Sequence, residues 1–303
     1  MKNSNEKDVS IIVVNYNTCE LTKQCIDSIY NKTEGISFEV IVVDNDSTDG
    51  SVESLSKDSR IKFIESGNNL GFGRANNLGL DKANGKYVFF LNSDTLLLNN
   101  AVKYFVDFAE NNQGLPIGGL GCQLVNGDYE PTHSCSMFPT IFETFKYEMK
   151  DHVATVLYKQ KPNRNSCMYK ASPFGYYEVD YVTGADLFVS RAVLNLYGTF
   201  DPDFFMYYEE TEMQFRWRKS GLKQYVIDGP RIVHLEQKST VRSNNFAREQ
   251  RDTKSRILYF KKTEHAVNYY LYRLLLLMFR IHYLVKPSLS FRQKKDFIKL
   301  LLS

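Results

Sequence analysis

Four short apolar runs, each followed at once by polar residues, constrain the fold of this 303-residue chain more than any other feature. They are rich in Val, Ile, Phe and Tyr and lie at Val9–Asn15, Phe38–Val43, Ile61–Ile64 and Tyr87–Leu91. Nearly continuous apolar runs of this kind are typical of strands covered on both faces of a sheet. Segments with helical spacing of apolar residues separate the runs, which gives a β-α-β-α-β-α-β order. The pattern predicts an α/β fold with a mostly parallel sheet and helices on both faces.

The polar residues that follow the apolar runs give the first functional signal. In open parallel sheets, ligands bind at the carboxyl ends of the strands. The polar clusters of this chain fall at those ends, in the segments Asn15-Tyr16-Asn17, Asp44-Asn45-Asp46, Gly67-Asn68-Asn69 and Asn92-Ser93-Asp94. We therefore expect a ligand site along this edge of the sheet.

The rest of the chain is less regular. Residues 126–178 are rich in Tyr, Pro and polar groups and show no clear period, so we interpret them as an irregular insertion. Further elements are expected as strands at 181–190 and 224–234 and as a helix at 204–219. From residue 247 the chain has helical spacing to its end, interrupted around Lys286-Pro287. We expect one domain over residues 1–245 and a helical extension over residues 246–303.

The net charge of +3 conceals an uneven distribution. Residues 247–303 contain 13 Lys and Arg against four Asp and Glu, a balance of +9, so the preceding residues carry −6. A basic segment of this kind favours an anionic partner. The segment 268–287 places aromatic and leucine residues between Arg273, Arg280 and Lys286, which suits a helix lying in a membrane interface.

The same basic segment also fits an ordinary packed helix pair or an oligomer interface, so a homodimer stays open. Because no recognised nucleic-acid module accompanies the basic residues, we expect no nucleic-acid partner.

The cysteine pattern and the N-terminal residues indicate where in the cell the protein is expected. The five cysteines form no CxxC pair and leave one over, which favours a reducing compartment. The N-terminal MKNSNEKDVS is polar and lacks the apolar centre of a signal peptide. No uncharged run reaches the ~18–20 residues of a membrane span. We expect a cytoplasmic protein that is peripheral on the inner face of the cell membrane.

Seven segments, occurring in order, complete a family pattern. They are VSIIVVNYNT, VIVVDNDSTDGS, NNLGFGRANNLGL, VFFLNSDT, VTGADLFVSR, FFMYYEETEMQFRWRKSG and IVHLEQKST. Over residues 9–245 the chain resembles the family 2 glycosyltransferases with a GT-A fold, and most of all their rhamnosyltransferase-like branch in bacterial O-antigen or capsule synthesis. The resemblance implies inverting transfer of a sugar from dTDP-rhamnose, or from a UDP-hexose, to a lipid-linked oligosaccharide. Residues 126–178 would then be an insertion on the acceptor side.

The resemblance implies roles for the strand-end residues. Asp44 would contact the nucleotide base, although an Asp at a strand end can equally cap the following turn. The other residues implied for the nucleotide-sugar pocket are Asn15, Tyr16, Asn17, Asn45, Asn69, Gly71 and Arg74. Arg74 fits an exposed helix position equally well.

Asn92-Ser93-Asp94 occupies the place of the family's DxD metal motif, of which only the last acid is retained. The resemblance implies that Asp94 and His234 hold Mg²⁺ or Mn²⁺, with Asn92 and Ser93 beside the donor. By itself the tripeptide also reads as a polar turn, and a lone His at a strand end is usually structural.

Glu209 and Glu210 stand where the family has an acidic pair that contains the general base. We assign the base to Glu210 and a helper or alternate role to Glu209. The same segment also has a structural interpretation, because acids at a helix start and Arg or Lys at its end complement the helix dipole.

The sequence has partial features of three other functions. Gly71-x-Gly73-x-x-Asn76 resembles a dinucleotide fingerprint, but Asn76 replaces the third glycine, and the unit is the third βα turn instead of the first. A nucleotidyltransferase would need a Gly-rich basic loop after the first strand, where this chain has NYNTCE. A non-catalytic sugar-nucleotide-binding or scaffold protein stays open as the alternative, because the metal motif is reduced to one acid.

Overall fold

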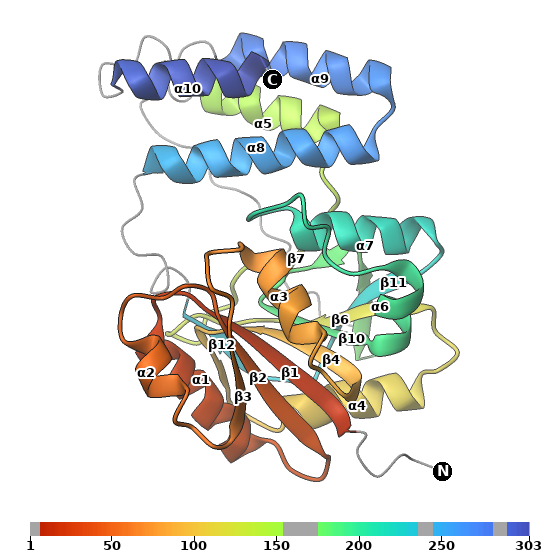
Figure 1. Cartoon of the computed structure of the whole chain (residues 1–303). Coiled ribbons are helices and arrows are strands. Elements are labelled where there is room, and N and C mark those ends of the chain that lie inside the picture. The colour runs from red at the N-terminus through yellow and green to blue at the C-terminus, as the bar shows by residue number, and fades with distance from the viewer. Residues whose placement is uncertain (1–6, 154–174, 236–244, 281–289, 303) are drawn as a thin grey trace. The chain divides into compact units, whose positions relative to one another are not determined.

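The computed structural model describes residues 7–153, 175–235, 245–280 and 290–302 (Figure 1). The chain divides into two compact units, each built from two separate stretches. The first contains the described residues of Met1–Met137 and Ser166–Arg242, and the second those of Phe138–Asn165 and Ser243–Ser303.

An eight-stranded sheet forms the centre of the first unit, in the order β3-β2-β1-β4-β10-β6-β11-β8 (Figure 1). Its strands are β1 (Lys7–Asn15), β2 (Phe38–Asp44), β3 (Ile61–Glu65), β4 (Gly85–Asn92), β6 (Ile117–Cys122), β8 (Tyr176–Val179), β10 (Asp186–Ser190) and β11 (Lys223–Ile227). The strands β3, β2, β1 and β4 are parallel, whereas β10 runs antiparallel to both of its neighbours and β8 runs antiparallel to β11. The predicted α/β class with a mostly parallel sheet is confirmed.

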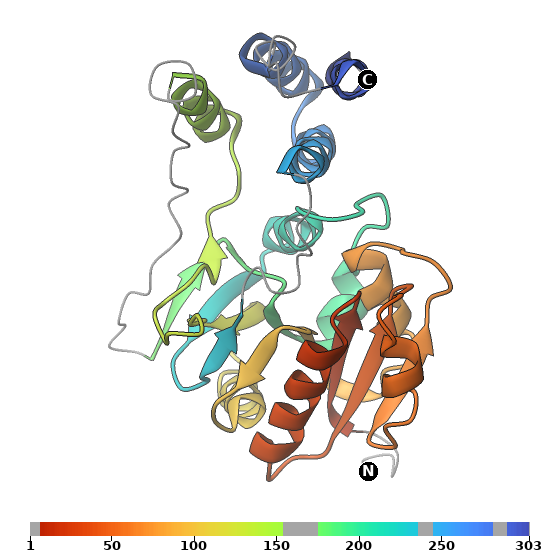
Figure 2. The ribbon, with the colours of Figure 1, turned by 90° about the vertical axis from the view of Figure 1, so that its left-hand side faces the viewer.

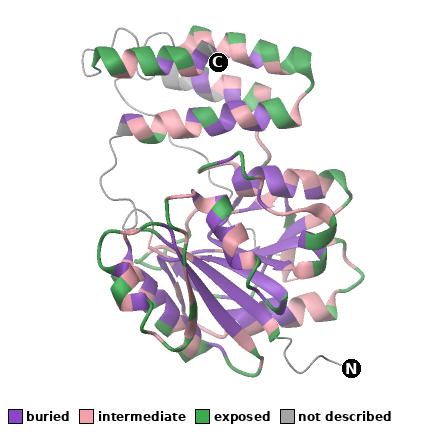
Figure 3. Cartoon of the chain, viewed as in Figure 1, coloured by how far each residue is buried: buried purple, intermediate pink, exposed green. Residues whose placement is uncertain are grey.

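Helices cover both faces of this sheet (Figure 2). One core contains residues of α1 (Cys19–Lys32) and α4 (Ala101–Asn111), and the other contains residues of α3 (Phe72–Leu80), α6 (Arg191–Tyr197) and α7 (Glu209–Lys219). The short α2 (Ser51–Leu55) follows β2. The central strands are buried almost throughout because both of their faces are covered (Figure 3).

Two small antiparallel pairs lie outside the main sheet. The strands β5 (Thr95–Leu97) and β12 (Ile232–His234) form one pair, and β7 (Cys135–Ser136) and β9 (Tyr181–Val182) form the other. The single strand expected at 224–234 is therefore wrong. The chain turns at Gly229, with φ of 111°, and passes from β11 into a different sheet.

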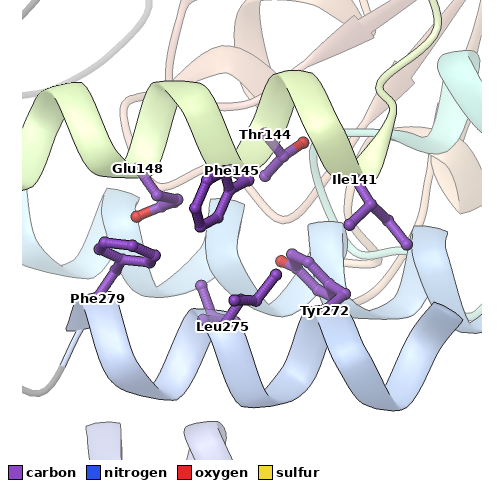
Figure 4. A pocket seen from close by; sticks show the side chains of 8 residues that line it. Ile141, Thr144, Phe145, Glu148, Tyr272, Leu275 and Phe279 are labelled. Atoms are coloured by element: carbon purple, nitrogen blue, oxygen red, sulfur yellow. The ribbon is translucent and has the colours of Figure 1, made fainter.

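The second unit consists of α5 (Ile141–Val153), α8 (Asn245–Thr263), α9 (Ala266–Arg280) and α10 (Phe291–Leu302). The presence of α5 corrects our expectation that 126–178 is irregular throughout. Its apolar side chains pack on α9, for example Phe145 against Phe279 with ring centroids 5.3 Å apart (Figure 4). The interruption expected at Lys286-Pro287 lies outside the described residues.

A buried ion network joins three helices of the second unit. Glu148 of α5 accepts from Arg280 Nε at 2.6 Å and pairs with Arg256 Nη2 at 2.8 Å. Glu249 also pairs with Arg280. Burial opposes the ionisation of Glu148, but the charges of the two arginines outweigh it and lower its pKa. Among the described helices, none is long and apolar enough to cross a membrane.

Candidate active site

The side chain of Asn15, at the carboxyl end of β1, organises the strand ends. Its Nδ2 donates to Asp44 Oδ2 at 2.6 Å and to Ser47 Oγ at 3.0 Å. Its Oδ1 accepts from the hydroxyls of Thr18 and Thr22 at 2.9 and 2.7 Å. Because Asn15 is fully buried, these bonds use both donors and both acceptor positions of its amide. Asn15 therefore shapes this edge through contacts within the protein.

Asp44 and Asn45 fix the loop after β2. Asp44 is buried, and its Oδ1 accepts the backbone N–H of Ser47 at 2.9 Å, which is the turn-capping contact expected of an Asp at a strand end. Asn45 accepts the N–H of Leu70 at 2.9 Å and donates to Asn69 Oδ1 at 3.1 Å. The first three strand-end clusters thus meet at one edge of the sheet.

The remaining residues of the expected nucleotide pocket differ in exposure. Tyr16 is 44% exposed, and Arg74 is also exposed, with its Nε donating to the carbonyl of Pro202. Asn17 has φ of 55° and accepts the N–H of Thr48 at 2.7 Å. Tyr16 and Arg74 are the side chains of this set with the most surface open to a ligand.

Asp94 and His234 are brought together by the β5–β12 pair. His234 stands opposite Thr95 in its register, and the N–H of Leu235 donates to the Asp94 carbonyl at 2.9 Å. As a result, Asp94 Oδ1 lies 3.2 Å from His234 Nε2, and both side chains are largely buried. The Nδ2 of Asn92 lies 3.4 Å from the same ring nitrogen.

This arrangement fits a divalent cation as far as its donor types are concerned. Carboxylate oxygen and imidazole nitrogen are ligands that Mn²⁺ accepts, and Mg²⁺ prefers oxygen. The described part of the chain holds no group of three or more His, Cys, Asp or Glu side chains that could bind a metal. Asp94 and His234 could therefore supply two ligands, and a diphosphate and water would have to supply the others. Ser93 lies beside the residue that precedes α1, with its Oγ 3.1 Å from the Thr18 hydroxyl.

Glu209 and Glu210 begin α7 after a turn with unusual backbone angles. Tyr207 and Tyr208 have φ of 73° and 69°, a region uncommon for residues other than glycine and often retained at functional sites. Glu209 is 4% exposed, and its Oε2 makes no hydrogen bond to any described residue. Burial raises the pKa of both carboxyls, and the charge of Glu210 raises that of Glu209 further.

The rest of α7 has the charge pattern expected of a stable helix. Glu212 is buried and pairs with Arg216 at 2.7 Å, one turn further along the helix. Arg218 and Lys219 lie in the last turn. The structural interpretation of this segment is confirmed, because Glu209, Glu210 and Glu212 all lie in the first turn of α7, and Glu212 is in addition paired with Arg216.

The N-terminal end of α3 is hydrogen-bonded to the segment that precedes Glu209 and Glu210 in the chain. The N–H of Phe72 donates to the Phe205 carbonyl at 2.9 Å. A Cβ at Gly71 would lie 2.0 Å from that same oxygen, and the φ of Gly71 is 83°, so only glycine fits. A Cβ at Gly184 would lie 3.1 Å from the Phe72 ring and 3.7 Å from Glu210 Cβ. Gly184 therefore lies against both Phe72 and Glu210.

Asp186, on β10, is a buried carboxyl that our sequence analysis did not single out. Its Oδ2 accepts the N–H of Cys122 at 2.7 Å, whereas its Oδ1 has no hydrogen-bond partner among the described residues. Burial raises the pKa of Asp186 to about 7, and the nearby His234 acts in the opposite direction. The N–H of Asn92 donates to the Ala185 carbonyl at 3.0 Å, so this strand end adjoins that of β4. The available signal was an acid inside an apolar strand run.

The first unit thus combines a mostly parallel sheet, polar strand ends, a carboxylate–imidazole pair and a buried acidic pair, which defines a protein of the α/β class with polar residues gathered at the carboxyl ends of its strands. Comparison with known families is more specific. Residues 10–167, over half of the chain, match the model of Glycosyl transferase family 2. The chain belongs to glycosyl transferase family 2.

Several relatives from bacteria and archaea share this region. An uncharacterized glycosyltransferase of Rickettsia bellii is 32% identical over 160 residues, which cover 49% of this chain and 22% of the relative. The low-salt glycan biosynthesis hexosyltransferase Agl10 of Haloferax volcanii is 28% identical over 221 residues, 71% of this chain and 63% of that protein. The poly(ribitol-phosphate) beta-glucosyltransferase of Bacillus spizizenii is 32% identical over 111 residues, 35% of this chain and 18% of that protein. This chain thus spans less than two thirds of each relative's length.

Two solved structures share the fold. GalNAc-T7 with UDP, GalNAc and Mn²⁺ superposes with a TM-score of 0.62 at 14% identity, covering 86% of this chain and 48% of the other. The mannosyltransferase PcManGT from Pyrobaculum calidifontis, in complex with GDP-Man and Mn²⁺, gives 0.57 at 16% identity, covering 98% and 80%. These likenesses confirm the GT-A architecture expected from the resemblance.

Proposed function

We propose that this protein is an inverting glycosyltransferase that moves a sugar from a nucleotide-diphosphate sugar to a glycan hydroxyl. One observation carries the proposal: Gly184 lies beside Glu210, since a Cβ added at Gly184 would be 3.7 Å from Glu210 Cβ, and the next residue, Ala185, accepts the N–H of Asn92. Asn92 in turn adjoins the pair of Asp94 and His234. A base and a diphosphate-binding pair around one point are what this displacement requires.

The donor pocket of the proposal is the edge formed by the strand ends. Asp44, Asn45 and Asn69 lie together there, with Tyr16 exposed beside them. Of the two solved structures that share this fold, one contains UDP and the other GDP-Man, which supports a nucleoside diphosphate sugar as ligand. We propose dTDP-rhamnose as donor, with UDP-hexoses next.

Asp94 and His234 would hold Mg²⁺ or Mn²⁺, and Asn92 would stand beside it. A bound divalent cation supplies neutralisation of the negative charge on a diphosphate leaving group. The solved neighbours contain Mn²⁺, which supports this assignment. Ser93 has a positioning role, because its hydroxyl ties this turn to Thr18.

Glu210 acts as the base in this proposal. It takes the proton of the acceptor hydroxyl as that oxygen forms a bond to the anomeric carbon and the bond to the diphosphate breaks, with inversion. The pKa of Glu210 is raised toward neutral pH, so its carboxylate is a stronger base than that of a free glutamate. Glu209, which is more deeply buried, retains its proton to higher pH and assists or alternates with Glu210.

We propose a lipid-linked oligosaccharide of bacterial surface-polysaccharide synthesis as acceptor. The support is the family and the names of two relatives, one from glycan biosynthesis and one acting on poly(ribitol-phosphate). The first unit would be the catalytic one.

A thermal-shift panel with dTDP-rhamnose, UDP-glucose, UDP-galactose, GDP-mannose and NAD, each with and without Mn²⁺, tests the proposal. A ligand at 100 times its dissociation constant stabilises the folded state by ~2.7 kcal/mol. We expect one nucleotide-sugar to stabilise the protein, more so with Mn²⁺, and Asp94→Ala to weaken that effect. Slow hydrolysis of the same donor without acceptor would distinguish an enzyme from a scaffold, and stabilisation by NAD alone would contradict the proposal.

A further inference from the structure

One helix of the second unit exposes an apolar stripe. On α9 the exposed side chains include Val267 (79%), Tyr270 (69%), Leu271 (50%), Leu274 (56%) and Met278 (59%). Their spacing of 3, 1, 3 and 4 residues places them within an arc of roughly 100° on one helix face. No charged residue interrupts this stripe, and Figure 3 shows the exposed segments along the helix.

The opposite face of the same helix is buried. Tyr272 and Leu276 are 2% and 1% exposed, and α9 packs there on α5 (Figure 4). The helix is therefore apolar on two opposite faces, of which the described helices cover one. A surface helix of a soluble protein normally exposes polar residues on its outer face. The packed core of this unit does not account for the outer stripe.

The helix α10 adds exposed positive charge to the same unit. Arg292, Lys295 and Lys299 are exposed, and Phe291 (83%) and Ile298 (37%) are exposed on the same helix. Exposed aromatic and aliphatic side chains beside Lys and Arg are typical of helices that lie in the headgroup region of a membrane. Tyrosine is also favoured at that depth, because its ring is apolar and its hydroxyl is polar.

We propose that the outer face of α9, with the basic side chains of α10, binds the surface of an anionic lipid bilayer. The exposed cations Arg292, Lys295 and Lys299 of α10 outnumber the exposed acid of that helix, Asp296, and this excess of positive charge selects an anionic surface. In an isologous pairing of two copies, the same basic surface would be brought toward its counterpart, and like charges would oppose each other. Binding of the second unit to a bilayer is independent of sugar transfer, so a failure of one proposal leaves the other untouched.

Vesicle co-sedimentation of the full chain tests the proposal, with pure phosphatidylcholine vesicles compared against vesicles containing phosphatidylglycerol. We expect binding to the anionic vesicles, weakened by salt. Leu271→Ser combined with Leu274→Ser should weaken it at least ~10-fold. Each of the single variants Arg292→Gln, Lys295→Gln and Lys299→Gln should weaken binding to the anionic vesicles ~5-fold.

Leu196→Ser is the matched control, because Leu196 is 75% exposed on α6 of the first unit. It should leave vesicle binding unchanged. Val267→Ser with Met278→Ser provides a second stripe variant, and thermal unfolding confirms that each variant is folded. Equal binding to both vesicle types, or stripe variants that bind as the wild type does, would overturn the proposal. A dimer that forms without lipid and is abolished by the stripe variants would overturn it as well, and would assign this face to a second copy.

Discussion

The carboxyl groups of Glu209 and Glu210 share one low-dielectric environment at the start of α7. Two acids so placed lose their protons in sequence, because ionisation of one raises the pKa of the other. The less buried Glu210 is the one that reaches its anionic form first, and that form is the one a general base requires.

Replacement of the base should therefore lower turnover and leave donor binding intact. We expect Glu210→Gln to reduce kcat by ~10²–10⁴ and Glu209→Gln to reduce it less. Product formation with donor and acceptor measures kcat, and the thermal shift with donor checks binding. A larger loss for Glu209→Gln would exchange the two roles.

The pH dependence of turnover should reflect the raised pKa of Glu210. Since burial favours the neutral form of Glu210, the rate should increase with pH through a midpoint above the 4.5 of a free glutamate. Initial rates across a pH series at saturating donor measure this midpoint. A rate that falls with rising pH over the same interval would argue against a carboxylate base.

Asp186 should make folding stability depend on pH. Its pKa of about 7, against an ordinary value of 3.8, means that the folded protein holds this proton more tightly than the unfolded chain. The associated stability is present below about pH 4 and is lost as pH rises through about 7, on the order of a few kcal/mol. The Tm of the wild type should fall relative to that of Asp186→Asn over this interval. Parallel Tm curves would refute the expectation.

Individual site residues differed in how far the sequence revealed them. Asp94 and His234 are 140 positions apart, and only the family pattern linked them, because their contact depends on the register of β5 and β12. Asp186 was missed because a run such as ADLFVS is interpreted first as a buried strand. Asn15 was expected to line a pocket, but the sequence could not show that four neighbours use its amide completely.

At the scale of elements, the contact between α3 and the segment before α7 depends on one glycine. Gly71→Ala would place a Cβ 2.0 Å from the Phe205 carbonyl, in addition to the cost of its positive φ. We expect a loss of several kcal/mol in stability and a large loss of activity, because the segment leading to Glu210 must move. Urea unfolding and turnover measure the two effects.

Gly50→Ala is a control for the positive φ of that variant. Gly50 has the same φ of 83°, with ψ of 6° against 174° for Gly71, and no atom lies within 4 Å of the position of its Cβ. It should cost only the ~1–2 kcal/mol of left-handed backbone. Equal losses for both variants would show that neither the close approach to Phe205 nor the extended ψ of Gly71 adds to the cost.

The strands of the first half were predicted well because their apolar runs are continuous and end in turn residues. The direction of β10 was not predicted, because an apolar run buried on both faces has the same composition whichever way the strand runs. Helix α5 was missed because the residues that cover its apolar face, such as Tyr272 and Phe279, follow more than 100 positions later. The sequence of α5 and its immediate neighbours does not reveal a contact with residues so far along the chain.

At the scale of the whole molecule, the second unit depends on a buried carboxylate between two arginines. Glu148→Ala would leave Arg256 and Arg280 buried without this partner, and we expect a loss of roughly 3–5 kcal/mol. Glu143→Ala on the same helix is the control, because its pair with Lys146 is exposed and contributes at most about 1 kcal/mol. Thermal unfolding monitored by circular dichroism compares them, and equal effects would mean that the network is not stabilising.

The division of the second unit into two stretches also has a consequence for synthesis on the ribosome. Helix α5 begins at Ile141, whereas its partners begin with α8 at Asn245. At ~5–20 residues per second, α5 is made roughly 5–20 s before α8 starts. During that interval Phe145 and Glu148 lack the partners that α8 and α9 supply, so the helical unit can assemble only after those later helices have been synthesised.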